Sequence, residues 1–268
     1  MTESAETLGI VGGPPQGALV AADFNNDGFF DIIASGRGNG IEDTTRRIML
    51  YINENGKKFI PRDGPDVGLA VLRTTDYNIT YSSAVAVDLN NDGLIDVVVG
   101  DANRTYRVFR NLGDFRFKEI ATLRPGARMA RPASADINED GLMDLVVNEG
   151  KVGLTLYTNR STDTGGWVEV AVNGLDGNTG GVGALVEVFK AGKLGDRTAY
   201  VGMQHVPAEN DNHVPLAPHF GLGPEKAVDV RVTLPTGEVL EAKDVKTTSR
   251  IVADFVAKRI ELRRERGK

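Results

Sequence analysis

Three short acidic stretches in this chain carry residues that could bind a cation. Each follows the pattern D-x-N-x-D-G-x-x-D, and the copies read "ADFNNDGFFDII" from Ala22, "VDLNNDGLIDVV" from Val87 and "ADINEDGLMDLV" from Ala135. Carboxylates this close together repel one another, so a positive charge is expected among them. Five fixed positions that recur three times indicate a repeated site.

The spacing of the oxygen-bearing residues predicts calcium. Oxygen ligands at positions 1, 3 and 5 and a backbone carbonyl at position 7 open the EF-hand loop, and glycine at position 6 permits its sharp turn. An all-oxygen set on a flexible loop suits Ca²⁺ better than Mg²⁺. About three Ca²⁺ ions per chain are therefore expected, one per loop. The candidate ligands, including the carbonyls at position 7, are Asp23, Asn25, Asp27, Phe29, Asp31, Asp88, Asn90, Asp92, Leu94, Asp96, Asp136, Asn138, Asp140, Leu142 and Asp144.

The motif is not an EF-hand. The bidentate Glu of that loop at position 12 is replaced by Ala34, Val99 and Val147, and the exit segments "DIIAS", "DVVVG" and "DLVVN" have the pattern of buried strands. An ion in such a loop would pin two strands of one sheet together. The alternative is a metal-free Asx turn, which Asp, Asn and Gly also favour. That alternative leaves the third acid, at position 9 of every copy, without an explanation.

The charge balance favours cations over nucleic acid as partners. The net charge is −6, from 37 acidic and 31 basic residues. Nine acids stand at positions 1, 5 and 9 of the three motifs. Without them 28 acids face 31 bases, so the acidity is local to these loops. No basic stripe is visible before the last dozen residues. Cysteine is absent, which excludes disulfides and thiolate metal sites.

Composition and patterning predict an all-β fold. The 32 glycines and the short apolar runs rich in Val and Ile indicate many strands joined by tight turns. Each repeat contains a strand, the acidic loop, two strands, a turn and a fourth strand. The third strand of each repeat closes with Asn53, Asn111 or Asn159, and the fourth begins at Phe59, Phe117 or Trp167.

Four strands per unit make one blade of a β-propeller. Three blades cannot close a ring, which takes about four to eight. The remaining residues, or a homo-oligomer, could complete the ring, or the array could stay open with a capped edge.

A different pattern begins at about Trp167. The segments "WVEVAV", "ALVEVF", "VDVRVTL" and "EVLEAKDV" alternate like half-buried strands, with Gly-rich turns between them. They predict a β-sandwich-like domain. The expected organisation is therefore blades over residues 1–165, a second β domain over 166–256 and a basic, helical tail over 257–268.

The repeats resemble the FG-GAP/VCBS repeats of integrin-type β-propellers, and this resemblance implies calcium in the corresponding loops. The stretches "NTGGVGALVEVF", "HFGLG" and "VTLPTGEV" are similar to the ASPIC/UnbV domain, which follows such repeats in the cartilage acidic protein and UnbV family. Members are usually secreted. The first twenty residues do not have the pattern of a signal peptide, and no apolar run approaches the length of a membrane span, so no compartment is assigned.

The three histidines, His205, His213 and His219, fall within one segment. Near Glu209, Asp211 and Asp229 they could hold a transition metal or supply a general base. Alternatively, His219 belongs to the structure of the "HFGLG" turn and the other two face solvent.

Two functions from different classes follow. The first is a calcium-binding scaffold that recognises a protein or carbohydrate ligand, with no nucleic acid and no membrane span. The alternative is a calcium-dependent enzyme of the lyase or cyclase type, acting in specialised metabolism and using the histidine region. A further possibility is a pure assembly role through self-association.

Overall fold

The computed structural model describes residues 4–11, 17–35, 48–69, 81–101, 105–124, 132–148, 153–207 and 217–263. Within these ranges the chain forms nineteen strands and two short 3₁₀ helices, η1 (Gly64–Val67) and η3 (Arg197–Ala199), and no α-helix. The predicted all-β fold is confirmed. No helix among the described residues is long and apolar enough to cross a membrane.

The repeats form three antiparallel sheets whose strands follow one another in chain order. The acidic loop of each repeat joins the first strand of its sheet to the second. The first sheet contains β1 (Leu19–Ala22), β2 (Asp31–Ser35), β3 (Ile48–Glu54) and β4 (Lys58–Asp63); the second contains β5 (Tyr81–Val87), β6 (Asp96–Asp101), β7 (Tyr106–Asn111) and β8 (Phe117–Leu123); the third contains β9 (Pro132–Ala135), β10 (Asp144–Asn148) and β11 (Leu154–Tyr157).

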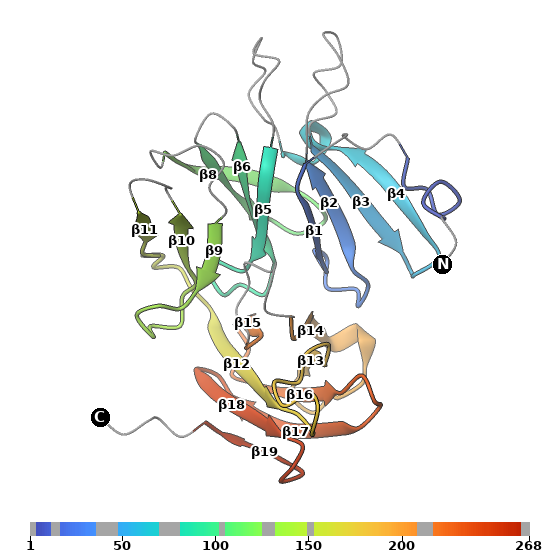
Figure 1. Ribbon diagram of the computed structural model, residues 1–268, viewed down its shortest axis with the longest axis vertical. Coiled ribbons are helices and arrows are strands. Elements are labelled where there is room, and N and C mark those ends of the chain that lie inside the picture. Colours follow the sequence, from blue (N-terminus) through green and yellow to red (C-terminus); the bar gives the residue numbers. More distant parts are fainter. Residues whose placement is uncertain are drawn as a thin grey trace.

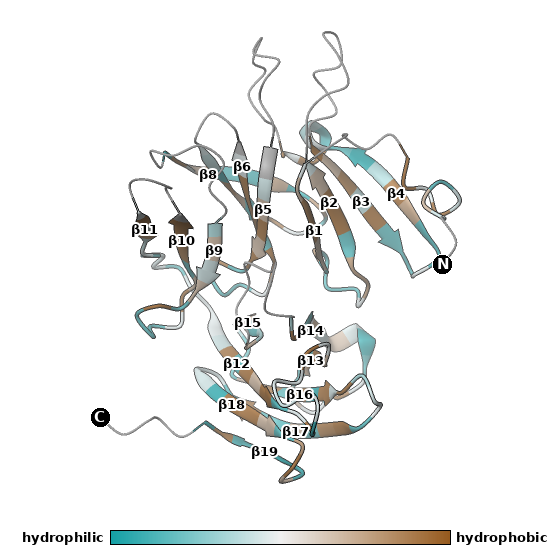
Figure 2. Ribbon diagram, in the orientation of Figure 1, coloured by the Kyte–Doolittle hydropathy of each residue, from teal (hydrophilic) through white to brown (hydrophobic). Residues whose placement is uncertain are grey.

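The three sheets stand side by side like propeller blades (Figure 1), and we call them blades 1, 2 and 3. Their first strands are neighbours, because β1 packs beside β5 and β5 beside β9. One apolar core, which includes Phe24, Leu50 and Phe109, fills the space between blades 1 and 2. A second, which includes Val98 and Met143, fills the space between blades 2 and 3. The apolar residues run along the strands, whereas the loop after β1 is hydrophilic (Figure 2).

The outer face of blade 1 is covered by the N-terminal segment. Ile10 packs against Tyr51 and Met49 on that face. The amide of Phe59 donates a hydrogen bond to the Leu8 carbonyl at 2.6 Å, and the Tyr51 hydroxyl donates one to Val11 at 3.2 Å. Residues before the first repeat therefore cap this end of the blade array.

Blade 3 differs from the other two, since it has three strands among the described residues. The pattern of the repeats placed the start of its fourth strand at Trp167, matching Phe59 and Phe117. Trp167 instead lies in β12 (Gly166–Asn173), which pairs with strands of the C-terminal region. The sequence cannot show this diversion, because the same strand pattern suits either sheet. Completion of a ring by self-association stays a prediction.

The C-terminal strands form two four-stranded sheets that enclose one core, as a β-sandwich does. We call this part the sandwich. One sheet has the order β15-β12-β18-β19, in which β12 and β18 are parallel, and the other has the order β14-β13-β16-β17. The remaining bounds are β13 (Leu185–Lys190), β14 (Tyr200–His205), β15 (His219–Gly223), β16 (Ala227–Thr233), β17 (Val239–Lys246), β18 (Ser249–Asp254) and β19 (Arg259–Leu262).

The expected helix over residues 257–268 is wrong for the described part of that segment. Residues 259–262 form β19, which pairs antiparallel with β18, and Ile260 packs against the sandwich core. The local charge pattern suits a helix, but pairing with the edge of a sheet outweighs such weak local preferences.

Candidate metal sites in the acidic loops

The three acidic loops share one local geometry, which the glycine at position 6 makes possible. Gly28, Gly93 and Gly141 have φ values of 86°, 89° and 87° in the left-handed region, where a side chain is strained. In each loop the carboxylate at position 1 accepts a hydrogen bond from the amide of this glycine, at 2.9, 2.8 and 2.9 Å. The predicted sharp turn at position 6 is confirmed.

Positions 3 and 5 also repeat their contacts. We call residues 23–31, 88–96 and 136–144 loops 1, 2 and 3. The Asn side chain at position 3 donates to the Asp carboxylate at position 5, at 2.9, 3.0 and 2.8 Å in these three loops. The same Asp accepts a hydrogen bond from the amide at position 7, at 2.9 Å in every loop. The side-chain oxygens of positions 1, 3 and 5 are therefore held on alternate residues of one turn.

The Asp at position 9 begins the second strand of its blade and is buried. Asp31, Asp96 and Asp144 have exposed fractions of 0%, 0% and 1%. Each accepts one hydrogen bond from the amide at position 2, at 3.1 to 3.2 Å, and one from the amide of the Asn that closes the third strand, at 2.8 Å. This contact gives position 9 a structural role that the sequence did not reveal: it ties the loop to the third strand.

Burial makes the charge of these carboxylates costly. Desolvation raises the pKa of Asp23 to about 6 and the pKa values of Asp31 and Asp96 to about 7, although backbone amides partly offset it. Desolvation also raises the pKa of Asp88 well above its ordinary range, and the Asp96 and Asp92 charges add to the effect. A bound cation would remove this cost, because an opposite charge favours the ionised form.

Two buried side-chain oxygens support the fit of a cation. Asn90 Oδ1, at position 3 of loop 2, and Asp136 Oδ1, at position 1 of loop 3, are buried without a hydrogen-bond partner. Such atoms cost free energy unless something satisfies them. The described carboxylates do not gather in threes around one point. The donor set instead includes amide and carbonyl oxygens along each turn, as Ca²⁺ sites do.

Side chains of asparagine link each loop to the next. The residue at position 4 has a left-handed backbone in all three loops, at Asn26, Asn91 and Glu139. Asn26 donates to the Gly93 carbonyl at 2.8 Å, and Asn91 donates to the Gly141 carbonyl at 2.9 Å. Loops 1, 2 and 3 are thus connected in series, and Glu139, which carries no donor, stands at the end of the series.

The strand-closing asparagines add a second set of links between blades. Asn111 donates to the Phe24 carbonyl in loop 1 at 2.8 Å, and Asn159 donates to the Leu89 carbonyl in loop 2 at 2.6 Å. These two residues were identified from the sequence only as the ends of strands. Their contacts show that they join neighbouring loops.

Loop 2 is covered by β15 of the sandwich. The amide of Gly223 donates to the Asn91 carbonyl at 2.9 Å, and His219 Nε2 lies 2.9 Å from Asn91 Oδ1. A Cβ on Gly221 would collide with Asp88 Oδ2. The "HFGLG" segment therefore brings bare backbone against the first carboxylate of this loop.

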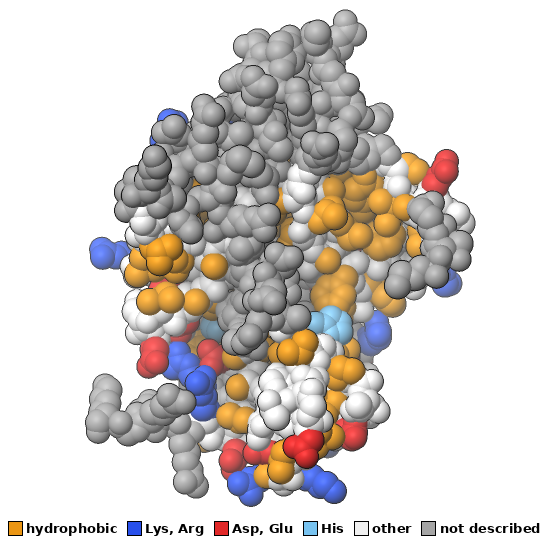
Figure 3. All heavy atoms as spheres, in the orientation of Figure 1, with side chains coloured by type: hydrophobic (Ala, Val, Ile, Leu, Met, Phe, Trp, Pro, Cys, Tyr) orange, Lys and Arg blue, Asp and Glu red, His pale blue; other side chains and the backbone are white. Residues whose placement is uncertain are grey.

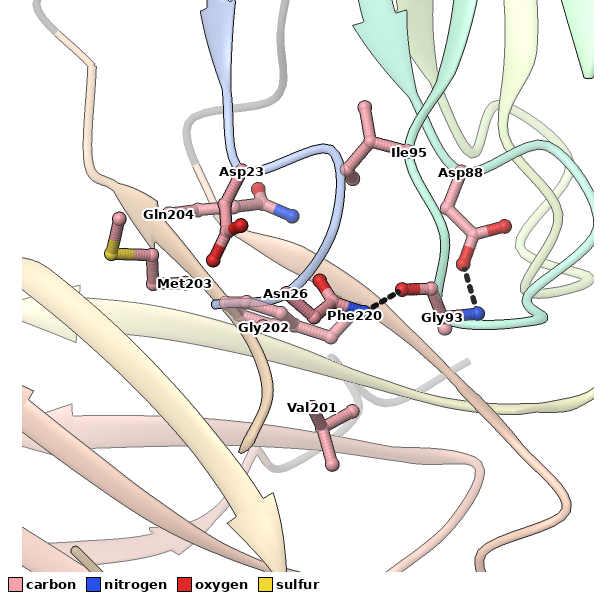
Figure 4. A pocket seen from close by; sticks show the side chains of 11 residues that line it. Asp23, Asn26, Asp88, Gly93, Ile95, Val201, Gly202, Met203, Gln204 and Phe220 are labelled. Carbon is pink, nitrogen blue, oxygen red and sulfur yellow. Dashed lines mark hydrogen bonds between the residues drawn. The ribbon is translucent and has the colours of Figure 1, made fainter. Parts of the chain in front are cut away.

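Loop 1 meets the sandwich around a small cavity (Figure 4). It is lined by Asp23, Asn26 and Asp88 of the acidic loops and by Gly202 and Gln204 of β14. Its volume of about 10 Å³ is close to the space that one water molecule needs. Beside this cavity, Arg197 Nη1 lies 3.4 Å from the Asp27 carbonyl, and its guanidinium lies 5.0 Å from the Phe29 ring centroid.

Loop 3 meets an arginine and a tryptophan of the sandwich. Arg250 Nη2 lies 2.7 Å from Asp136 Oδ2, and its guanidinium lies 5.0 Å from the Trp167 ring centroid. A Cβ on Gly141 would collide with the Trp167 indole, so the ring rests directly on the loop. Acidic and basic side chains gather where blade 3 meets the sandwich (Figure 3).

The described histidines do not share a site. His219 is buried between Trp167, at 5.5 Å between ring centroids, and Asn91, and burial lowers its pKa to about 4. His205 is exposed, with its ring centroid 5.4 Å from that of Phe30. Neither lines the cavity beside loop 1. His213, Glu209 and Asp211 lie outside the described residues. These contacts support a structural role for His219 in the "HFGLG" segment.

Sequence reasoning missed three groups of residues at these sites. Asn26 and Asn91 had a signal, because the same residue stands at position 4 in two copies of the motif. Arg197 and Arg250 had none, since they lie far along the chain in segments without a motif. Trp167 was noted only as the start of a strand.

The repeats match a known family. Residues 23–99 and 88–147 match the FG-GAP-like repeat. The N-terminal region therefore contains FG-GAP-like repeats, as the motifs predicted. The match ends at residue 147, and the resemblance of the C-terminal region to the ASPIC/UnbV domain stays a prediction. No curated protein matches the chain at a significant level.

Proposed function

We propose that each acidic loop binds one Ca²⁺ ion and that the ions stabilise a β scaffold for ligand binding. The ligands would be the amide oxygen at position 3, the carbonyl at position 7 and the carboxylates at positions 1, 5 and 9. The three carboxylates of one loop do not converge on one point in this structure, so ion binding would require them to turn toward the ion. The observation that carries this proposal is the burial of carboxylates such as Asp31 and Asp96, which accept hydrogen bonds from backbone amides of the described residues. A divalent cation supplies the charge that these groups lack.

The contacts of the loops indicate what the ions would stabilise. Each loop joins two strands of its blade, reaches the third strand through position 9, and contacts the sandwich. Loop 2 also contacts both neighbouring loops. Ion binding would therefore hold together the blades and the sandwich as well as the individual turns.

The scaffold role rests on the FG-GAP-like repeats, which often occur in proteins that bind other molecules, and on the histidines, which do not converge. We infer a protein or carbohydrate ligand. We also propose the division into blades over residues 1–165 and an ASPIC/UnbV-like domain over 166–256. The enzymatic alternative would need a cavity with convergent polar groups at His205 or His219, and the contacts described above favour no such arrangement.

Thermal unfolding with and without calcium tests the proposal. Protein stripped with a chelator should unfold at a clearly lower temperature than protein in excess Ca²⁺, because an ion that binds only the folded state stabilises it. Mg²⁺ at the same concentration is the control and should restore much less. Equal unfolding temperatures in chelator and in Ca²⁺ would reject calcium stabilisation.

A further inference from the structure

The three loops have the same motif but different charges beside their first carboxylate. Asp23 and Asp88 accept hydrogen bonds from backbone amides, and the charges that act on them come from neighbouring carboxylates. Asp136, at the same position in loop 3, is paired with the guanidinium of Arg250. Loops 1 and 2 also have an arginine nearby, but Arg197 lies at the carbonyl of position 5 in loop 1 and Arg110 acts on the carboxylate of position 9 in loop 2. Among the described residues, only in loop 3 does a cation meet a positive charge paired with the first carboxylate.

Arg250 contacts one oxygen of Asp136, and the other oxygen has no hydrogen-bond partner. Oδ2 accepts hydrogen bonds from Arg250 Nη2 at 2.7 Å and from the Gly141 amide at 2.9 Å. Oδ1 is buried and has no hydrogen-bond partner, and the Asp136 side chain is 5% exposed. Arg250 therefore occupies one oxygen of Asp136 and leaves the second without a partner, so its expected effect on an ion at loop 3 is electrostatic.

Arg250 also has a second acid within reach. Its Nε lies 3.7 Å from Glu169 Oε2 on β12, and Glu169 is held in addition by Arg263 at 3.0 Å. The Trp167 ring supports the guanidinium from one side. The arginine can therefore move toward Glu169 without losing all of its partners.

We propose that Arg250 is a tethered cation that weakens Ca²⁺ binding at loop 3, so that the chain has two tighter ion sites and one weaker site coupled to the sandwich. This inference rests on the proposed function. Because linkage is reciprocal, an ion in loop 3 weakens the Arg250 pair with Asp136 and favours the pair with Glu169. The strength of the contact between blade 3 and the sandwich then depends on the calcium concentration.

The chain contains its own reporter for this site. Trp167 is the only tryptophan, and its indole rests on Gly141 of loop 3. Tb³⁺ bound in loop 3 should be sensitised through this indole, and Ca²⁺ should displace it. Titration of that luminescence with Ca²⁺ follows the ions nearest the indole, and the part of the signal that Asp136→Asn removes gives the affinity of loop 3. Calorimetry counts the ions in all loops.

Removing the charge of Arg250 should tighten loop 3. We expect Arg250→Gln to raise its Ca²⁺ affinity on the order of tenfold. Arg250→Lys, which keeps the positive charge, should behave like the wild type. Arg231→Gln is the matched control, because Arg231 pairs with Glu241 on the sandwich, away from the loops. Unchanged or weaker binding at loop 3 in Arg250→Gln would overturn the inference.

A second variant changes the affinity in the opposite direction. Glu169→Gln removes the alternative partner of Arg250, so loop 3 should bind Ca²⁺ several-fold more weakly than in the wild type. If Arg250→Gln does not fold, the Ca²⁺ affinity of loop 3 in Glu169→Gln tests the inference by itself. Tighter binding in Glu169→Gln would reject the inference. Failure of the proposed function is distinguishable, because calorimetry would then find no ions in loops 1 and 2 either.

Discussion

Loops 2 and 3 carry the same motif in two different environments. In loop 2, Asp88, Asn90 and Asn91 are buried beneath β15, and bare backbone at Gly221 lies against the first carboxylate. In loop 3, Asn138 and Asp140 are exposed, and the first carboxylate faces Arg250. The hydrogen bonds inside the two turns are nearly the same. The motif therefore determines the local turn, and residues far away in the chain determine its electrostatics.

This difference has a consequence for how calcium acts on the two loops. A buried carboxylate without a nearby cation has a large desolvation cost, which an ion can offset. A carboxylate that is already paired with an arginine gains less from the same ion. We therefore expect loop 2 to depend strongly on calcium and loop 3 to depend on it weakly.

The largest expected effect is on the free energy of unfolding, when the first carboxylate of loop 2 or of loop 3 is replaced in a matched pair of substitutions. In excess Ca²⁺, Asp88→Asn should lower the free energy of unfolding by about 4 kcal/mol, because a tightly bound ion is lost. Asp136→Asn should lower it by about 2 kcal/mol, because its ion binds less tightly. Denaturant titration measures both.

In chelator the order of the two stability losses should reverse, so that Asp88→Asn costs less unfolding free energy than Asp136→Asn. Asp88→Asn should then cost little or even stabilise the protein, because the substitution removes a buried charge. If Asp88→Asn costs the same in chelator as in Ca²⁺, the residue supports the turn alone and loop 2 has no ion.

A smaller effect comes from His219, which lies between loop 2 and Trp167. Its pKa is about 4 in the folded protein, against an ordinary value of 6.5, so protonation favours the unfolded chain. The contribution of neutral His219 is complete above about pH 6.5 and is lost as the pH falls toward about 4. Between about pH 7 and about pH 5 the wild type should lose about 2 kcal/mol more than His219→Gln.

Equilibrium unfolding of both proteins in saturating Ca²⁺ measures this difference, and the comparison cancels the titration of the acidic loops. Parallel stability curves over this pH range would show that His219 is not buried against loop 2 as described.

The smallest expected effect concerns the links between loops. Asn26→Ala removes the hydrogen bond to the Gly93 carbonyl and should cost about 1 kcal/mol. Glu139→Ala, at the same position of loop 3, should change the stability by less than about 0.5 kcal/mol, because no next loop follows. Both residues have a left-handed backbone, so the pair is matched in conformation. Equal costs in thermal unfolding would contradict a role for the links.

Local patterns in the sequence predicted local structure well. The repeated motif predicted the turns, the glycine at position 6 and the strand after each loop, because these depend on residues next to one another. The alternating segments after Trp167 predicted the sandwich for the same reason.

Contacts between segments far apart in the chain could not be predicted from local sequence patterns. Nothing in the pattern distinguishes β12 as a strand of the sandwich from a fourth strand of blade 3, and the parallel pairing of β12 with β18 has no local signal. The contact of Arg250 with Asp136 joins residues 114 positions apart. The predicted helix over residues 257–268 was wrong because pairing with β18 stabilises β19, whereas the residues of β19 by themselves suggest a helix.

Calorimetric titration of the chelated protein with Ca²⁺ counts the ions that the acidic loops bind. We expect about three ions per chain, with two bound more tightly than the third. A total of zero or one would contradict this expectation and would show that the loops are mostly metal-free turns.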